Sequence, residues 1–98
     1  MPASSWEKRP DVTVRLEFFG IPRQRAGVAS IDVEAATLTA ALRQAAIALP
    51  DFANTCLDGD RLRSDYLANI NGREFTVRPE TPLQPGDTVL ILSADAGG

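Results

Sequence analysis

The sequence contains no histidine and a single cysteine, Cys56. It therefore cannot build a zinc site from the usual ligands, a Cys-His dyad, a Ser-His-Asp triad or a cluster held by four thiolates. Cys56 lies in an apolar-spaced stretch without a cationic neighbour to lower its pKa, so it is interpreted as a small buried hydrophobe. We expect no metal site, no bound cofactor and no catalytic side chain, so the chain is not expected to be an enzyme by itself.

Long apolar runs and long basic runs are also missing. No apolar stretch approaches the roughly 20 residues that span a bilayer, and the polar N-terminus lacks a hydrophobic targeting segment. The net charge is −3, which leaves no electrostatic footprint for nucleic acid or for an anionic membrane. We expect a cytoplasmic protein that binds neither nucleic acid nor membrane.

The 98 residues, 44% of them hydrophobic and 23% charged, are typical of one soluble globular domain. Residues 1–10 are polar and punctuated by proline, which predicts a disordered lead-in. We assign residues 11–93 to the folded domain and residues 94–98 to a flexible C-terminal tail.

Two segments near the start alternate apolar and polar residues, which predicts two adjacent antiparallel strands. A loop is predicted between them, because glycine and proline gather at residues 20–27. The apolar positions of the two strands are Val12, Val14, Leu16 and Phe18, then Ala29, Ile31 and Val33.

One main helix is predicted to follow. Thr37 is a suitable N-cap, Pro50 disfavours further helix, and residues 51–65 are expected to form an irregular connection with a short helical turn near residues 52–57. The apolar stripe of the main helix consists of Leu38, Ala41, Leu42, Ala45 and Leu49.

Three further strands complete the pattern. Asn71-Gly72 predicts a two-residue hairpin turn, and Val89 and Ile91 alternate in a last strand. The order ββαβββ favours an α+β fold in which one helix packs across a mixed sheet and the last strand lies beside the first. Leu90 and Leu92 would then face away from the helix, with Phe19 as a neighbour, and could form a partner-binding patch.

The chain ends in Gly97-Gly98, directly after the last strand and a short spacer that includes Ala96. Two residues without side chains form a slim tail that can thread a narrow channel. The tail thus predicts chemistry at the terminal carboxylate of Gly98.

Several segments together resemble the MoaD/ThiS family of ubiquitin-like sulfur carriers. The resemblance covers nearly the whole chain and implies a ubiquitin-like β-grasp fold. It includes the opening strand and the start of the helix, and its most specific pieces are Asn69 to Phe75, Thr81-Pro82-Leu83, Pro85 to Val89 and Gly97-Gly98.

The resemblance also implies a function. In the family, an E1-like enzyme uses ATP to adenylate the terminal glycine, here Gly98, and a sulfurtransferase then supplies sulfur to form a thiocarboxylate. The sulfur passes to an acceptor enzyme such as the large subunit of molybdopterin synthase, so a role in molybdenum cofactor biosynthesis is ranked first.

Alternatives stay open at this point. The chain lacks the proline pair that often precedes the tail in small subunits of molybdopterin synthase, and thiamine-pathway carriers lack a long connection such as Asp51 to Asp65. Sulfur transfer toward thiamine, cysteine or a specialised metabolite is a further possibility. A ubiquitin-like modifier would join Gly98 to lysines of target proteins, and an interaction module would not use the glycine end at all.

Overall fold

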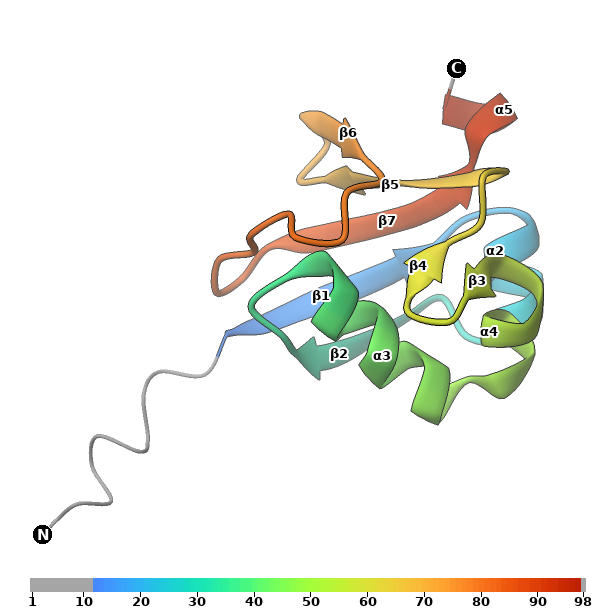
Figure 1. Cartoon of the computed structure of the whole chain (residues 1–98), viewed down its shortest axis with the longest axis horizontal. Coiled ribbons are helices and arrows are strands. Elements are labelled where there is room, and N and C mark those ends of the chain that lie inside the picture. The colour runs from blue at the N-terminus through green and yellow to red at the C-terminus, as the bar shows by residue number, and fades with distance from the viewer. Residues whose placement is uncertain (1–11, 98) are drawn as a thin grey trace, which may run out of the picture.

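The computed structural model describes residues 12–97 and contains one five-stranded sheet with helices packed on it (Figure 1). The predicted lead-in, residues 1–10, lies outside the described residues. The elements in chain order are β1 Thr13–Phe18, α2 Ile21–Ala26, β2 Ser30–Glu34, α3 Leu38–Ala48, α4 Pro50–Cys56, β3 Leu57–Asp58, β4 Arg61–Leu62, β5 Tyr66–Ile70, β6 Glu74–Thr76, β7 Thr88–Ser93 and α5 Ala94–Gly97.

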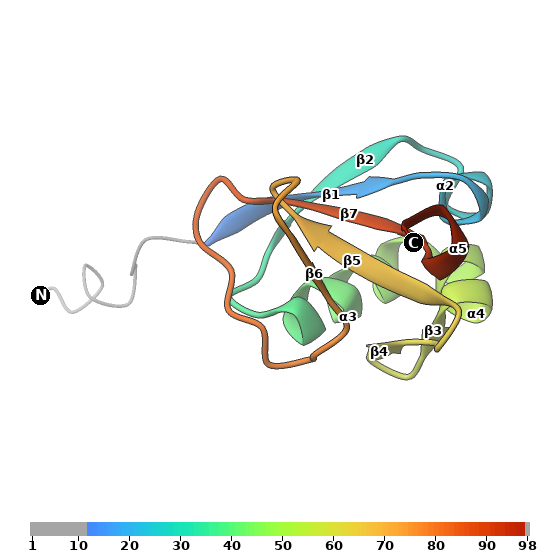
Figure 2. The same ribbon diagram turned by 90° about the horizontal axis from the view of Figure 1, so that it is seen from above.

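The sheet has the strand order β2-β1-β7-β5-β6. Strands β1 and β7 pair in parallel at its centre, and all the other neighbours in this sheet pair antiparallel. The predicted mixed sheet, with the last strand beside the first, is confirmed. Helices α3 and α4 cover one face of the sheet (Figure 2), and the opposite face is called the outer face below.

Two predictions about the connections are wrong in detail. Residues 20–27 contain helix α2, which Gly20 and Gly27 bracket with positive φ angles of 71° and 76°. Residues 51–65 contain most of helix α4 and the small β3–β4 hairpin. Pro50 ends α3 as expected but also opens α4, because a proline in the first helical turn needs no N–H partner.

The core lies between the covered face of the sheet and helices α3 and α4. Leu16, Leu42, Val89 and Ile91 are each at most 1% exposed, as their alternating or helical spacing predicts. Phe52 of α4 does not stand out in the sequence pattern, yet it is fully buried, and its ring centroid lies 4.9 Å from that of Phe18. Helix α4 therefore belongs to the core.

The Asn71-Gly72 turn has the predicted backbone angles, but the loop is one residue longer than predicted. Both residues have positive φ angles, 56° and 73°, as a type I′ turn requires, and the Arg73 N–H donates to the Ile70 carbonyl at 3.0 Å. Because Ile70 pairs with Glu74, the loop between the strands has three residues, Asn71 to Arg73. The Asn71 side chain also bridges to the next turn, because its Nδ2 donates to Asp87 Oδ1 at 2.8 Å and its Oδ1 accepts from the Thr88 N–H at 2.8 Å. These bonds hold the β5–β6 turn against the N-terminal end of strand β7.

We predict that Leu42→Ala destabilises the fold by about 2–5 kcal/mol, the usual cost of a large-to-small change in a packed core. Ile47 lies on the same helix and is 81% exposed, so Ile47→Ala should change stability by less than about 0.5 kcal/mol. Urea denaturation of both variants measures the difference. Equal effects would show that α3 does not bury the predicted stripe.

A second prediction concerns the pH dependence of stability. Asp60 accepts hydrogen bonds from Arg43 Nε and Nη2 at 3.2 and 3.0 Å, and this interaction lowers the pKa of the Asp60 carboxyl. A carboxyl whose pKa is lower in the folded state stabilises the fold above its unfolded pKa, and the effect is lost as the pH falls through the folded pKa. Asp60→Asn should therefore reduce stability at neutral pH, and its difference from the wild type should shrink below about pH 4. A constant difference from pH 7 to pH 2 would contradict this assignment.

Candidate functional site

The C-terminal tail follows directly on β7, a central strand of the sheet. Val89 and Ile91 anchor strand β7 in the core, since both side chains are fully buried. At its C-terminal end, β7 leads directly into α5 (Figure 1). Gly97 and Ala96 belong to α5, and Gly98 lies outside the described residues. The rigid core strand thus fixes where the tail leaves the domain.

Residues 94–97 form one helical turn, where the sequence analysis predicts a flexible tail. The Ala94 N–H donates to the Asp65 carbonyl at 2.8 Å, which ties the start of α5 to the loop before β5. An isolated four-residue helix is marginal in water because nucleation is costly. Mobility of the tail in solution therefore stays a prediction.

A hollow of about 370 Å³ lies at the root of the tail. Three segments that are distant in sequence meet there, namely the start of α2, the loop before β5 and the end of β7. Its lining residues are Ile21, Ser64, Asp65, Tyr66, Ser93, Ala94 and Asp95. The hollow therefore adjoins the point where the tail leaves the domain.

The residues predicted to form a partner-binding patch share the outer face. Leu90 pairs with Glu17 on one side and Asn69 on the other, and Leu92 pairs with Leu67. Leu90 and Leu92 alternate with Val89 and Ile91, which point into the core. Leu92 is only 7% exposed and Leu90 is half-buried.

Phe19 directly follows β1 and is 57% exposed. Its N–H donates to the Ile91 carbonyl at 3.0 Å, which continues the β1–β7 ladder and brings Phe19 alongside Leu92. The structure thus brings the three predicted residues to one face of adjacent strands.

Two further apolar residues, Leu67 and Phe75, lie on the same face and were not predicted from the sequence. Leu67 pairs with Leu92, and Phe75, 53% exposed, pairs with Asn69 of β5. The alternation of Tyr66, Ala68 and Ile70 toward the core could have placed Leu67 on the outer face. Phe75 could not be placed, because the exposure of a short edge strand depends on which elements cover it.

Side chains offer little chemistry of their own. Among residues 12–97, no group of three His, Cys, Asp or Glu side chains is placed to hold a metal ion. Cys56 is fully buried, and burial raises the pKa of its thiol although a hydrogen bond to Tyr66 opposes the rise. A buried neutral thiol is inert, so Cys56 is confirmed as part of the core.

No helix in the described part of the chain is long and apolar enough to cross a membrane.

No family model and no curated protein matches the sequence, but solved structures do. Small archaeal modifier protein 1 from Methanosarcina acetivorans aligns with a TM-score of 0.74 and 21% identity, over 92% of this chain and all of that one. A protein assigned as molybdopterin converting factor, subunit 1, from Pyrococcus furiosus aligns with a TM-score of 0.65 and 25% identity, over 84% and 97%. A chain of the Amycolatopsis orientalis BexX/CysO complex aligns with a TM-score of 0.70 and 22% identity, over 87% and 99%.

These similarities confirm the predicted ubiquitin-like β-grasp fold. The structural neighbours are also of the kind that the sequence resembles, the ubiquitin-like carriers of the MoaD/ThiS type. The neighbours span almost the same length as this chain, so the fold accounts for nearly all of the domain.

We predict that residues 95–98 move on the nanosecond timescale in the free protein, because α5 is too short to be stable alone. Backbone ¹⁵N relaxation should give order parameters below about 0.6 for the tail and near 0.85 for β7. Val89 to Ile91 serve as the internal reference. A tail as rigid as β7 would contradict a role in which Gly98 enters the active site of another protein.

Proposed function

We propose that this protein is a sulfur carrier whose terminal residue, Gly98, is converted to a thiocarboxylate that donates sulfur in cofactor biosynthesis, first of all in a molybdopterin-type pathway. The observation that carries the proposal is the Gly97-Gly98 end, which follows the central strand of a β-grasp domain. The core strand aims the tail, and the tail has no side chain after Ala96 that would obstruct a narrow channel.

The chemistry begins with activation. A terminal carboxyl with an ordinary pKa of about 3.5 is ionised at neutral pH, and the anion is a poor acyl electrophile. An E1-like partner therefore joins a carboxylate oxygen of Gly98 to the α-phosphorus of ATP, and pyrophosphate leaves. ATP is bound by that partner, so the carrier itself needs no cofactor.

Sulfur transfer follows on the activated carbon. The outer sulfur of a persulfide on a sulfurtransferase attacks the acyl carbon of Gly98, and AMP leaves. A second thiol of the donor then attacks the inner sulfur, which breaks the sulfur–sulfur bond, forms a donor disulfide and leaves the thiocarboxylate on Gly98. The carrier contributes no acid or base, which agrees with its lack of histidine.

Partner enzymes would dock on the outer face around Phe19, Leu90 and Leu92, beside the tail. An apolar patch rimmed by polar groups is typical of a protein-binding surface. The acceptor is an enzyme such as the large subunit of molybdopterin synthase, and a cytoplasmic location suits all three partners. The similarity to a molybdopterin converting factor subunit supports this order of candidates.

A ubiquitin-like modifier is the second candidate, because the structure is also similar to a small archaeal modifier protein. Activation of Gly98 would be the same, but the acyl group would pass to a lysine amine and not to sulfur. Transfer of sulfur toward thiamine, cysteine or a specialised metabolite would differ from the first proposal only in the acceptor. The similarity to a chain of the BexX/CysO complex is a reason to retain these acceptors as candidates.

Intact mass spectrometry of the protein from its own host tests the proposal. The carrier should gain the mass difference of one oxygen-to-sulfur exchange, and removal of Gly98 should abolish the gain. Co-purification of a molybdopterin synthase large subunit would support the first-ranked acceptor, whereas a thiazole synthase or a cysteine synthase would overturn it.

A modifier would instead give adducts of higher mass with a Gly-Gly remnant on target lysines. Lys8 is the single lysine of the chain, so a Lys8→Arg variant has no side-chain amine and separates conjugation to other proteins from self-conjugation. Absence of both products in the presence of ATP, a sulfur donor and the activating enzyme would overturn carrier and modifier alike.

A further inference from the structure

Helix α2 and the C-terminal tail lie at the same end of the sheet strands. Because β1 and β7 are parallel, the segments that follow these two strands leave the sheet on the same side, at the C-terminal ends of both strands. Ile21 of α2 lines the hollow at the root of the tail together with Ala94 and Asp95. An enzyme that receives Gly98 must therefore pass close to α2.

The charge of α2 differs from that of the whole protein. The net charge is −3, yet the chain from residue 18 to residue 31 has two arginines, Arg23 and Arg25, and no acidic residue. Both arginines are exposed. By contrast, Arg15, Arg43 and Arg78 each form an ion pair with a carboxylate of the domain.

Neither Arg23 nor Arg25 has an ion-pair or hydrogen-bond partner for its guanidinium among residues 12–97. A guanidinium presents a planar set of donors that matches a carboxylate in a bidentate geometry. These two side chains are therefore available to carboxylates of another protein.

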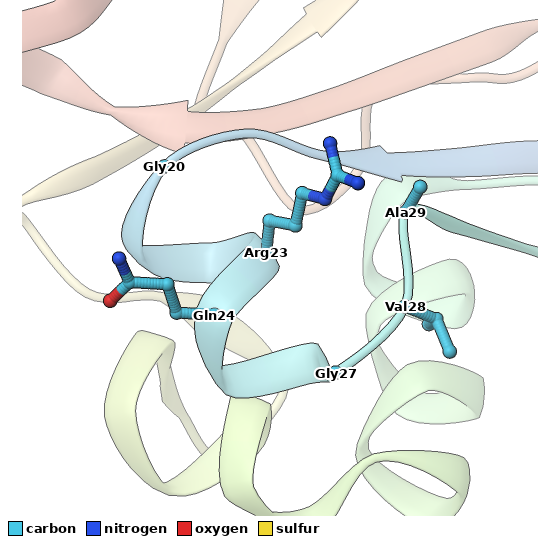
Figure 3. Close-up of a pocket in the computed structure, with 6 residues that line it drawn as sticks. All are labelled: Gly20, Arg23, Gln24, Gly27, Val28 and Ala29. Carbon is cyan, nitrogen blue, oxygen red and sulfur yellow. The ribbon is translucent and has the colours of Figure 1, made fainter.

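A hollow of about 550 Å³ lies beside Arg23. Figure 3 shows the Arg23 side chain extending toward β1 and Ala29, whereas Gln24 projects from the other side of the helix. Gly20 and Gly27 stand at the two ends of α2, and Val28, 41% exposed, supplies an apolar wall. The hollow can accept a short loop that carries both a carboxylate and an apolar side chain.

We propose that this α2 surface, formed by Arg23, Arg25 and the adjoining hollow, binds an acidic loop of the adenylating enzyme that receives Gly98. The proposal rests on the proposed function and adds the chemistry of one docking contact. Pairing at α2 fixes the carrier beside the mouth of the active site, so the short tail enters in one orientation. Unpaired charges of one sign also steer an oppositely charged partner during encounter.

The experiment measures thiocarboxylate formation at increasing carrier concentration, with ATP, a sulfur donor and the adenylating enzyme purified from the protein's own host. Arg23→Glu and Arg25→Glu should each lower kcat/KM about tenfold at low ionic strength, mainly through KM, because a charge at the rim of an interface acts on association. The loss should become smaller at 0.5 M salt, where charges are screened over a few ångströms. The value of kcat should stay unchanged, because a charge that acts on association does not alter the chemical step that follows binding.

Arg73→Glu is the matched control. Arg73 is an exposed arginine next to the Asn71-Gly72 turn. This turn lies beside the N-terminal end of β7, whereas the tail follows the C-terminal end of that strand. The Arg73→Glu substitution makes the same change in net charge as the two α2 substitutions. Circular dichroism checks that all three variants fold.

The outcomes separate the two proposals. Normal kinetics for both α2 variants, or an equal loss in Arg73→Glu, would overturn the docking role while leaving the carrier function in place. A wild-type protein that forms no thiocarboxylate would overturn the proposed function itself, and with it the premise of the α2 contact.

Discussion

The parallel pairing of β1 with β7 is the constraint on which the rest of the structure depends. Two strands in parallel cannot be joined by a tight turn, so the chain must cross over the sheet between them. Helices α3 and α4 make this crossing and bury the stripe that contains Leu42 together with Phe52. The same pairing places the C-terminal ends of β1 and β7 side by side, so Phe19 and α2, which follow β1, lie near the tail, which follows β7.

The two ends of the central strand β7 differ in how firmly they are held. At the end where β7 begins, the Asn71 side chain forms hydrogen bonds with both Asp87 and Thr88, and the Gly86 N–H donates to the Thr13 carbonyl at 2.8 Å. At the end where β7 leads into α5, the Ala94 N–H donates to the Asp65 carbonyl. The start of β7 is thus held by several bonds, whereas the turn after its end is tied to the rest of the domain through the loop before β5.

The two faces of the sheet also differ. The covered face is apolar and packed, whereas the outer face places Leu90 between Glu17 and the nearly buried Asn69. The outer face therefore combines apolar and polar groups and exposes less apolar area than a purely apolar face would. The buried Cys56 and Tyr66 lie on the core side, where burial raises the pKa of each.

The sequence by itself determined the elements whose signal is local. Alternation defined β1, β2 and β7, helical spacing defined α3, and Asn71-Gly72 defined the hairpin turn, because each pattern reflects one buried face or one backbone angle. The glycine end was likewise visible in the sequence. Only the tertiary structure decided that α4 completes the core, that Phe75 stays exposed, and that the guanidinium groups of Arg23 and Arg25 have no ion-pair partner among residues 12–97. Burial and pairing of these residues depend on segments far away in the chain, which no local pattern specifies.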